Sequence, residues 1–220
     1  MKNISAFDSL GPIMVGPSSS HTAGAVKIGL IGNKIASKKI TSTKFYLHGS
    51  FAKTYKGHGT DKALLGGILG YDEKNSKLKK AFEIAKKNNL KYEFIPKDLG
   101  DVHPNSVLMD IETENGENIK IQGSSIGGGA IIITNLNGLE TEFSGENPTI
   151  LTYHKDQPGV VAKLTTILAK YNLNISYMKV LRKEGTDMAN MVIEVDNPFK
   201  ESLKDEINSK IDAIKNIYMI

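Results

Sequence analysis

Four short polar segments of this chain carry the side chains best suited to chemistry: residues 16–22, 57–61, 103–105 and 123–129. The first segment reads Gly-Pro-Ser-Ser-Ser-His-Thr, and its polar side chains are those of Ser18, Ser19, Ser20, His21 and Thr22. Hydroxyls and backbone N–H groups just before a helix N-terminus form a cradle for a carboxylate or a phosphate. The first segment therefore predicts an anion-binding site.

The other three segments read Gly-His-Gly-Thr-Asp, His-Pro-Asn and Gly-Ser-Ser-Ile-Gly-Gly-Gly. Glycine and proline mark turns, and catalytic residues often lie on such loops. Three of the five histidines, His21, His58 and His103, belong to these polar segments. Histidine transfers protons near neutral pH. We therefore expect the four segments to meet in one site.

Each segment also has a purely structural interpretation. Ser20 could cap the helix that follows it. Residues 57–59 could form a turn, and His103 could be a loop histidine without a function. Residues 127–129 could bend a sheet, or line a phosphate loop that lacks the usual lysine.

The composition limits the chemistry that the chain can perform alone. It contains no cysteine, which excludes disulfides, zinc thiolate sites and cysteine-ligated iron–sulfur clusters within this chain. No His-Glu-x-x-His sequence is present, and no metal ligand is expected in this chain. A serine hydrolase built from Ser19, His58 and Asp61 stays open as an alternative.

The charge and hydropathy of the sequence argue against a nucleic-acid or membrane partner. The net charge is +4, but Arg182 is the single arginine among 28 basic residues. Arginine is the preferred residue for reading phosphates and guanine edges, so we expect no nucleic-acid partner. The N-terminus lacks a long apolar run and no stretch is long enough to span a bilayer, so we expect a cytoplasmic protein without membrane contact.

The C-terminal third follows the order β-α-β-β-α-β, which is typical of a ferredoxin-like domain. Alternating apolar residues predict strands, and apolar residues at helical spacing predict helices. The predicted strands are residues 149–153, 174–180, 189–195 and 214–219, and the predicted helices begin at Val160 and at Phe199.

The region before it mixes helices with antiparallel hairpins and predicts an α+β fold. The predicted helices are residues 20–37, 61–69 and 75–87, and the predicted strands are residues 44–48, 106–112, 118–122 and 130–135. His48 and His154 fall in predicted strands and receive no function. Turn-forming residues between 140 and 148 place the boundary between two domains, residues 1–147 and 148–220.

The C-terminal domain resembles an ACT domain, through Asp-x-Pro-Gly-Val at residues 156–160 and Asn-Ile at residues 174–175. ACT domains are regulatory modules that bind small molecules, usually amino acids, where two copies meet. The resemblance implies homodimerisation through this domain. It also implies an effector site at Asp156, Pro158, Gly159, Val160, Asn174 and Ile175.

The four polar segments together resemble the β subunit of bacterial iron–sulfur-dependent L-serine dehydratases. The resemblance implies an L-serine ammonia-lyase that forms pyruvate and ammonia. It also implies an α subunit whose cysteines ligate a [4Fe–4S] cluster. The family's first domain is similar to the allosteric substrate-binding domain of some phosphoglycerate dehydrogenases.

The resemblance also implies roles for individual residues. His58 is the expected base, with His21 and His103 as further catalytic residues. The expected substrate-binding residues are Ser18, Ser19, Ser20, Thr22, Thr60, Asp61, Asn105, Ser124 and Ser125. The alternative from another class is a non-enzymatic amino-acid-binding regulatory protein.

Overall fold

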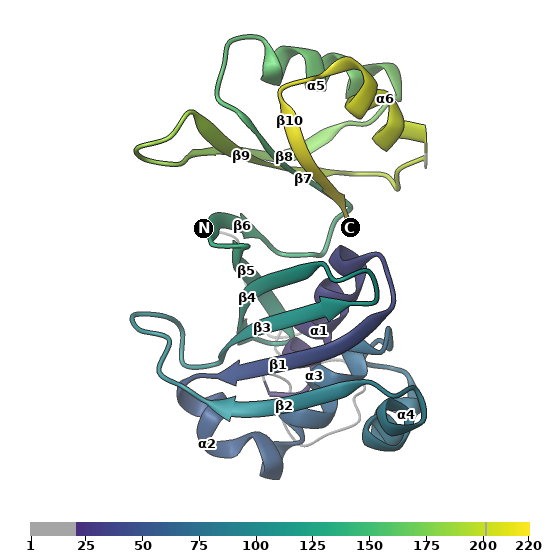
Figure 1. Ribbon diagram of the computed structural model, residues 1–220, viewed down its shortest axis with the longest axis vertical. Helices are drawn as coiled ribbons and strands as arrows, with labels where there is room; N and C mark the ends of the chain where they lie inside the picture. The colour runs from purple at the N-terminus through teal and green to yellow at the C-terminus, as the bar shows by residue number, and fades with distance from the viewer. Residues whose placement is uncertain (1–20, 201) are drawn as a thin grey trace. The chain divides into compact units, whose positions relative to one another are not determined.

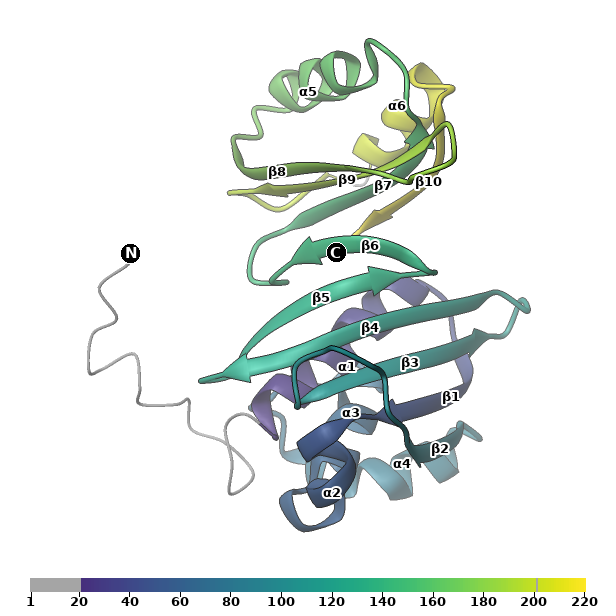
Figure 2. The same ribbon diagram turned by 90° about the vertical axis from the view of Figure 1, so that its left-hand side faces the viewer.

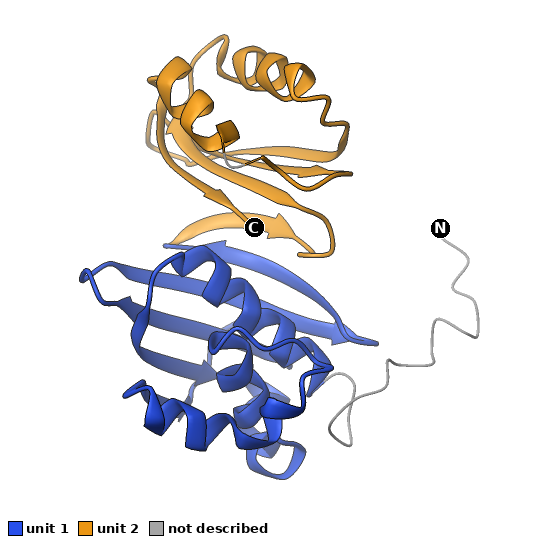
Figure 3. Ribbon diagram, turned by 90° about the vertical axis from the view of Figure 1, so that its right-hand side faces the viewer, with its two compact units in different colours: residues 1–137 blue, residues 138–220 orange. Residues whose placement is uncertain are grey.

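The computed structural model describes residues 21–200 and 202–220 (Figure 1). The chain forms two compact units, residues 1–137 and residues 138–220 (Figure 3). Both units combine helices with a β-sheet, so the expected α+β class is confirmed. The domain boundary after residue 147 stays a prediction.

The first unit begins with a helix and ends in three antiparallel strands. Its elements are α1 (Ala23–Ala36), β1 (Ile40–Leu47), α2 (Gly49–His58), α3 (Thr60–Ile68), the 3-10 helix η2 (Ser76–Lys80), α4 (Ala81–Lys87), β2 (Lys91–Pro96), β3 (Ser106–Thr113), β4 (Asn118–Gly127) and β5 (Ala130–Leu136). Within this unit the strands lie in the order β2-β1-β3-β4-β5. β1 is parallel to β2, and the other neighbouring strands are antiparallel.

Helices α1 and α3 pack together on one face of this sheet (Figure 2). Fully buried apolar side chains fill the space between the layers, among them Ile28, Leu64, Met109 and Ile121. Burial of such side chains is the main stabilising contribution to a fold of this kind. The packing fixes the N-terminal end of α1 against the ends of β3 and β4, where the polar segments lie.

Several elements of the first unit differ from the expected ones. α1 begins at Ala23 with Thr22 at the N-cap position, later than the start expected at residue 20. β1 begins at Ile40, because the β-branched residues from Ile40 onward extend the strand. His48 therefore lies just after β1 and not in it. The helix expected over residues 75–87 is divided into η2 and α4.

The second unit has the expected β-α-β-β-α-β order after a short first strand. Its elements are β6 (Leu139–Phe143), β7 (Thr149–Lys155), α5 (Val160–Lys170), β8 (Ile175–Arg182), β9 (Met188–Val195), α6 (Ser202–Lys210) and β10 (Ile214–Met219). Strands β7 to β10 form a sheet in the order β10-β7-β9-β8. The ferredoxin-like arrangement is confirmed, and His154 lies in β7 as expected.

Both helices of the second unit cover one face of its sheet (Figure 1). Ile150, Leu164, Ile193 and Ile207 meet in the buried core between these layers. β6 contacts the sheet through polar groups, since the Lys179 ammonium pairs with the Glu142 carboxylate and Asn190 Nδ2 donates to the Glu140 carbonyl at 2.9 Å.

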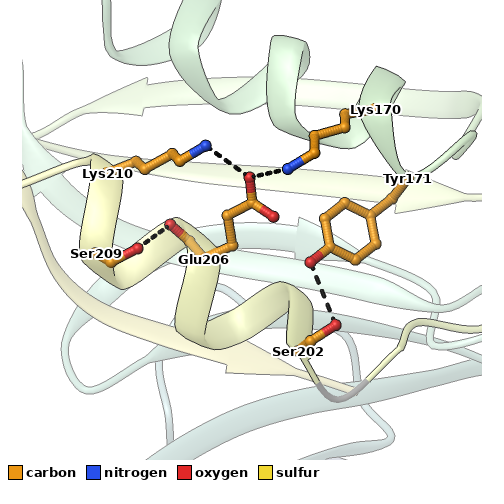
Figure 4. A network of polar contacts seen from close by, with 6 residues as sticks. All are labelled: Lys170, Tyr171, Ser202, Glu206, Ser209 and Lys210. Atoms are coloured by element: carbon orange, nitrogen blue, oxygen red, sulfur yellow. Dashed lines mark hydrogen bonds and ion pairs between the residues drawn. The ribbon is translucent and has the colours of Figure 1, made fainter.

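A polar network joins α5 to α6 (Figure 4). The ammonium groups of Lys170 and Lys210 each lie 2.8 Å from Glu206 Oε1. Tyr171 and Ser202 share a hydrogen bond of 3.2 Å between their hydroxyls. Hydrogen bonds from Lys170, Lys210 and Tyr171 lower the pKa of Glu206 to about 2. The network therefore holds Glu206 as a carboxylate through the ordinary pH range.

Candidate functional site

The first polar segment reaches the site through His21 and Thr22, which directly precede α1. Thr22 is 4% exposed, and its Oγ1 donates a hydrogen bond of 3.3 Å to the carbonyl of His58. This bond joins the first polar segment to the second. The other predicted residues of the first segment, Ser18, Ser19 and Ser20, lie outside the described residues.

His21 and His58 form the centre of the site. Their ring centroids lie 4.7 Å apart at an interplanar angle of 84°. Nε2 of His21 lies 3.0 Å from Ser50 Oγ. Burial lowers the pKa of His21, and the nearby charge of His58 lowers it further. The lowered pKa favours the neutral form of His21 near pH 7.

The second polar segment is a junction between two helices and not a loop. His58 is the last residue of α2, and Gly59 (φ 71°) separates it from Thr60, the first residue of α3. A positive φ is readily adopted by glycine, so Gly59 permits the abrupt change of direction. Burial raises the pKa of Asp61, although the backbone N–H and the ammonium of Lys62 oppose the shift.

The third polar segment caps the start of α2. The backbone N–H of Ser50 donates to the Pro104 carbonyl at 2.8 Å, and His48 Nδ1 accepts from the Leu99 N–H at 3.1 Å. Gly49 has φ of 54°, and a Cβ there would lie 2.6 Å from the Pro104 oxygen. Only glycine fits this position without displacing the cap.

Within the third segment, His103 is exposed while Asn105 is half-buried. Nδ1 of His103 accepts from the backbone N–H of Asn105 at 3.1 Å. The Asn105 carbonyl in turn accepts from the backbone N–H of Ser125 at 3.0 Å. This second bond joins the third segment to the fourth.

Most of the fourth polar segment is the end of β4 and not a loop, because the strand continues through Gly127. Side chains alternate along a strand, so Ser124 and Ser125 point to opposite faces. Ser124 Oγ lies 2.7 Å from Ser106 Oγ. Ser125 faces α1, where a Cβ on Gly24 would lie 2.1 Å from its Oγ. The structure therefore brings Ser125, and not Ser124, to the start of α1.

Residues 123–127 also match the Gly-x-Ser-x-Gly pattern of serine hydrolases. That pattern places its serine on a sharp turn between a strand and a helix. Ser125 instead lies within a strand that pairs with β3 and β5. The geometry therefore gives no support to a nucleophilic serine at this position.

Four buried polar atoms at the site have no hydrogen-bond partner among the described residues: His58 Nδ1, Thr60 Oγ1, Asn105 Oδ1 and Ser125 Oγ. Leaving a buried polar group unpaired costs roughly 1–3 kcal/mol. A ligand, a partner chain or water that reaches these atoms would recover that free energy. All four atoms belong to residues that the sequence marked as candidates.

Two neighbours of the site were missed by the sequence analysis, His48 and Ser50. His48 was assigned to a strand and given no function. Ser50 follows Gly49 in a His-Gly-Ser sequence, which shares its residue types with the other polar segments. That composition was the available signal. The contact between Ser50 and His21 spans 29 residues and has no local pattern.

The predicted effector turn of the second unit lies at the start of α5. Gly159 (φ 90°) is the N-cap of that helix, and Val160, its first residue, is buried. Asp156, Pro158 and Gly159 are exposed.

The other predicted effector residues lie at the start of β8. Asn174 donates through Nδ2 to Asp196 at 2.6 Å, and Ile175 packs against the core. Both groups of predicted effector residues lie at the ends of elements, and Asp156, Pro158, Gly159 and Asn174 are the exposed members.

The chain has no cysteine, so it cannot supply the thiolates of a cysteine-ligated iron–sulfur cluster. No group of three or more His, Asp or Glu residues suited to a metal occurs in the ranges 21–200 and 202–220. In the same ranges, no helix has the length and apolar character needed to cross a membrane.

Each of the two parts of the chain matches a known protein family. Residues 5–135 match the family described as "Serine dehydratase beta chain", and residues 150–218 match the "AHAS small subunit-like ACT domain". The "L-serine dehydratase, beta chain" of Peptoniphilus asaccharolyticus is 47% identical, over 94% of each chain. The "Probable L-serine dehydratase, beta chain" of Bacillus subtilis is 43% identical, over 98% of this chain and 97% of the other.

A more distant relative is the "D-3-phosphoglycerate dehydrogenase" of Synechocystis. It is 31% identical over 98 residues, which are 44% of this chain and 18% of that enzyme. The family match spans more than half of the chain, and the two β chains match nearly all of it. This chain therefore belongs to the serine dehydratase β chain family.

Proposed function

We propose that this chain is the β subunit of a cytoplasmic L-serine ammonia-lyase, which forms pyruvate and ammonia together with an α subunit that carries a [4Fe–4S] cluster. Membership of the β chain family supports the proposal. The absence of cysteine supports placing the cluster on another chain. The observation that carries the proposal is the set of four buried polar atoms at the site that have no partner in residues 21–200 and 202–220.

The start of α1 is the proposed binding site for the substrate carboxylate. The first backbone N–H groups of a helix have no partner within it, and the helix dipole favours an anion there. Ser125 Oγ is buried beside the first turn of α1 and is unpartnered among the described residues. Thr22 adjoins the same turn. In the proposal, the carboxylate-binding site also includes Ser18, Ser19 and Ser20.

His58 is the proposed base. Its Nδ1 is buried without a partner in the described part of the chain, whereas Nε2 of His21 is engaged by Ser50. The free nitrogen of His58 can therefore accept the α-proton of serine. The neutral His21 beside it adds no positive charge that would oppose this transfer.

The reaction balances as a dehydration followed by a hydrolysis. The Cα–H bond breaks and its proton moves to His58, while the Cβ–O bond breaks and hydroxide leaves, giving 2-aminoacrylate. Transfer of the proton from His58 to this hydroxide then forms water and restores the base. Tautomerisation to the imine and addition of water then give pyruvate and ammonia. The partner chain is proposed to assist the departure of the hydroxyl group, and no residue of this chain is assigned to that step.

The remaining predicted residues keep secondary roles in the proposal. Asn105 and Thr60 present oxygens that have no partner within the described part of the chain and can bind the substrate's polar groups. Asp61, His103 and Ser124 stay predicted substrate-binding or catalytic residues. In the second unit, residues 156–160 with Asn174 and Ile175 form the proposed effector site. Two copies of the chain are proposed to pair through that unit.

Anaerobic co-expression with the cysteine-bearing α chain tests the proposal. We expect pyruvate to form from L-serine when both chains are present, and not with either chain alone. Exposure to oxygen should abolish the activity. A chain that binds an amino acid tightly but shows no partner-dependent activity would instead support the regulatory protein. Activity without iron that is lost on reaction with a serine-directed probe would support the hydrolase.

A further inference from the structure

Ser50 lies in the first turn of α2, and its side chain faces the centre of the site. Its Oγ is 3.0 Å from Nε2 of His21, and the contact is partly buried. Phe51, the next residue along α2, contacts the same imidazole with ring centroids 5.5 Å apart. The first turn of α2 therefore contacts His21 through both a polar group and an aromatic ring.

The backbone of Ser50 is fixed on both sides. Its N–H donates to the Pro104 carbonyl at 2.8 Å, and its own carbonyl accepts from Thr54 Oγ1 at 2.8 Å. Gly49 (φ 54°) has no Cβ and lets the Pro104 oxygen approach closely. The Ser50 hydroxyl is therefore presented to His21 from a rigid support.

A hydroxyl held at one ring nitrogen constrains an imidazole. It restricts the plane of the ring, and it forms a hydrogen bond with Nε2 whichever of the two groups donates. The orientation of the base by a third group is a general feature of catalytic histidines. Around His21 this matters because His58 stands edge-on to its ring at 4.7 Å.

We infer that Ser50 is a positioning residue for His21 and that it connects His21 to the loop of residues 103–105. Its hydroxyl orients the His21 ring toward His58, and its N–H ties the same turn to Pro104. A displacement of the loop of residues 103–105 would therefore move Ser50 and, with it, the His21 ring. The consequence for catalysis rests on the proposed function, whereas the effect on the His21 ring does not.

The first test measures the His21 ring in the full chain without its partner. Histidine 15N spectra report the tautomer and the pKa of each imidazole. We expect the tautomer populations and the pKa of His21 in Ser50→Ala to differ from those in the wild type, because the hydrogen bond to Nε2 is lost. Signals of His154, in the second unit, should not change. An unchanged His21 signal in Ser50→Ala would overturn the inference.

Two variants separate this effect from a general disturbance of α2. Ser50→Thr keeps the hydroxyl and should restore the wild-type His21 signal. Tyr55→Phe removes another hydroxyl from the same helix, keeps the ring that stacks on Phe94, and should leave that signal unchanged. If Tyr55→Phe altered His21 as strongly as Ser50→Ala, the effect would be structural and the inference would fail.

The second test uses the assembled two-chain enzyme. Ser50→Ala should lower kcat by about 10- to 100-fold, the loss seen when groups that orient metal-bound histidines are removed. The KM for L-serine should stay within about twofold, because Ser50 lies behind His21 and does not bind substrate in the proposal. The pH profile of kcat should shift, and Ser50→Thr should recover most of the activity.

The two tests fail in different ways. A wild-type assembly that forms no pyruvate from L-serine would contradict the proposed function and leave the His21 spectra interpretable. A normal kcat and pH profile in Ser50→Ala, with an active wild type, would contradict the inference alone.

Discussion

The candidate site of the first unit and the polar pairs of the second unit around Glu206 and His154 use polar side chains in opposite ways. In the first unit, the site around His21 and His58 keeps four buried polar atoms that have no partner among the described residues. In the second unit, Glu206 is paired with two lysines, and the buried His154 shares a hydrogen bond of 3.1 Å with Thr152. Buried polar groups are normally paired, so the first arrangement is the unusual one.

The contrast distinguishes a binding site from a structural network. A completed network stabilises the unit that contains it and leaves little capacity for a ligand. An incomplete network costs stability until a ligand or partner completes it. Substitutions of the candidate-site groups that have no partner among the described residues should therefore change activity more than stability. Substitutions in the completed network of the second unit should change stability alone.

The largest expected effect is on turnover, in His58→Asn. Loss of the proposed base should lower kcat of the two-chain enzyme by roughly 10²- to 10⁴-fold. Pyruvate formation from L-serine measures it. The free energy of unfolding should change little, because His58 Nδ1 has no hydrogen bond to lose among the described residues.

A histidine outside the site provides the matched control for His58. His154→Gln removes an imidazole from the second unit and should keep near-normal turnover in the assembled enzyme. Near-normal turnover in His58→Asn would remove His58 from the role of base. A large loss of stability in that variant would contradict the contrast between the two units.

The second prediction concerns packing at the start of α1. A Cβ in Gly24→Ala would lie 2.1 Å from Ser125 Oγ and 2.6 Å from Ser125 Cβ. Such overpacking should lower the free energy of unfolding by about 1–3 kcal/mol, measured by urea denaturation.

A compensating substitution identifies the source of that loss. Ser125→Gly combined with Gly24→Ala should recover much of the lost stability, because it removes both clashing atoms. Gly57→Ala is the control, since a Cβ at Gly57 meets nothing within 4 Å. If the double variant were no more stable than Gly24→Ala alone, Ser125 would not be the group that limits approach to α1.

The third prediction is a pH dependence in the second unit. Burial lowers the pKa of His154, although Asp156 acts in the opposite direction. The unfolded chain then binds the proton more tightly than the folded chain, so stability should fall as the pH drops below about 6.5. Urea unfolding at pH 7.5 and at pH values below 6.5 measures the loss.

His154→Gln isolates that contribution. The glutamine keeps a polar group beside Thr152 but has no group that titrates near neutral pH. The difference in stability between the two pH values should be smaller in this variant, and His21, whose pKa is also lowered, accounts for part of the remainder. An equal pH dependence in wild type and variant would show that His154 does not contribute.

The sequence allowed the meeting of the four polar segments to be predicted, because their residue types share one chemistry. It also predicted the β-α-β-β-α-β order, since each element of the second unit has its own apolar pattern. Helix α2 was missed because Gly49, Thr54 and Gly57 weaken its helix propensity. β2 was missed because it is an edge strand of mixed exposure that ends at Pro96.

Two features of the candidate site were also not predicted, because local sequence patterns do not show them. The end of β4 was taken as a loop, so Ser124 and Ser125 were treated alike. Alternation along a strand separates them at once, but only when the strand is known to reach Gly127. The contact between Ser50 in α2 and His21 ahead of α1 is long-range, and no local spacing in the sequence predicts it.

The smallest expected effect is in the completed network of the second unit, in Glu206→Gln. Removing the carboxylate leaves Lys170 and Lys210 without their shared partner, so the melting temperature at neutral pH should fall slightly. The effect should shrink at high salt, because ion pairs near the surface are screened. Turnover of the two-chain enzyme should not change.

The pH dependence provides the sharper measurement. The pKa of Glu206 is lowered from 4.5 to about 2, so its stabilising contribution is complete above the unfolded value and is lost as the pH falls from about 4.5 toward 2. The melting temperatures of wild type and Glu206→Gln should therefore converge in acid. Glu184→Gln, at an exposed carboxylate between β8 and β9, should show no such convergence. A difference between wild type and Glu206→Gln that persisted at pH 2 would mean that the carboxylate's charge is not what joins α5 to α6.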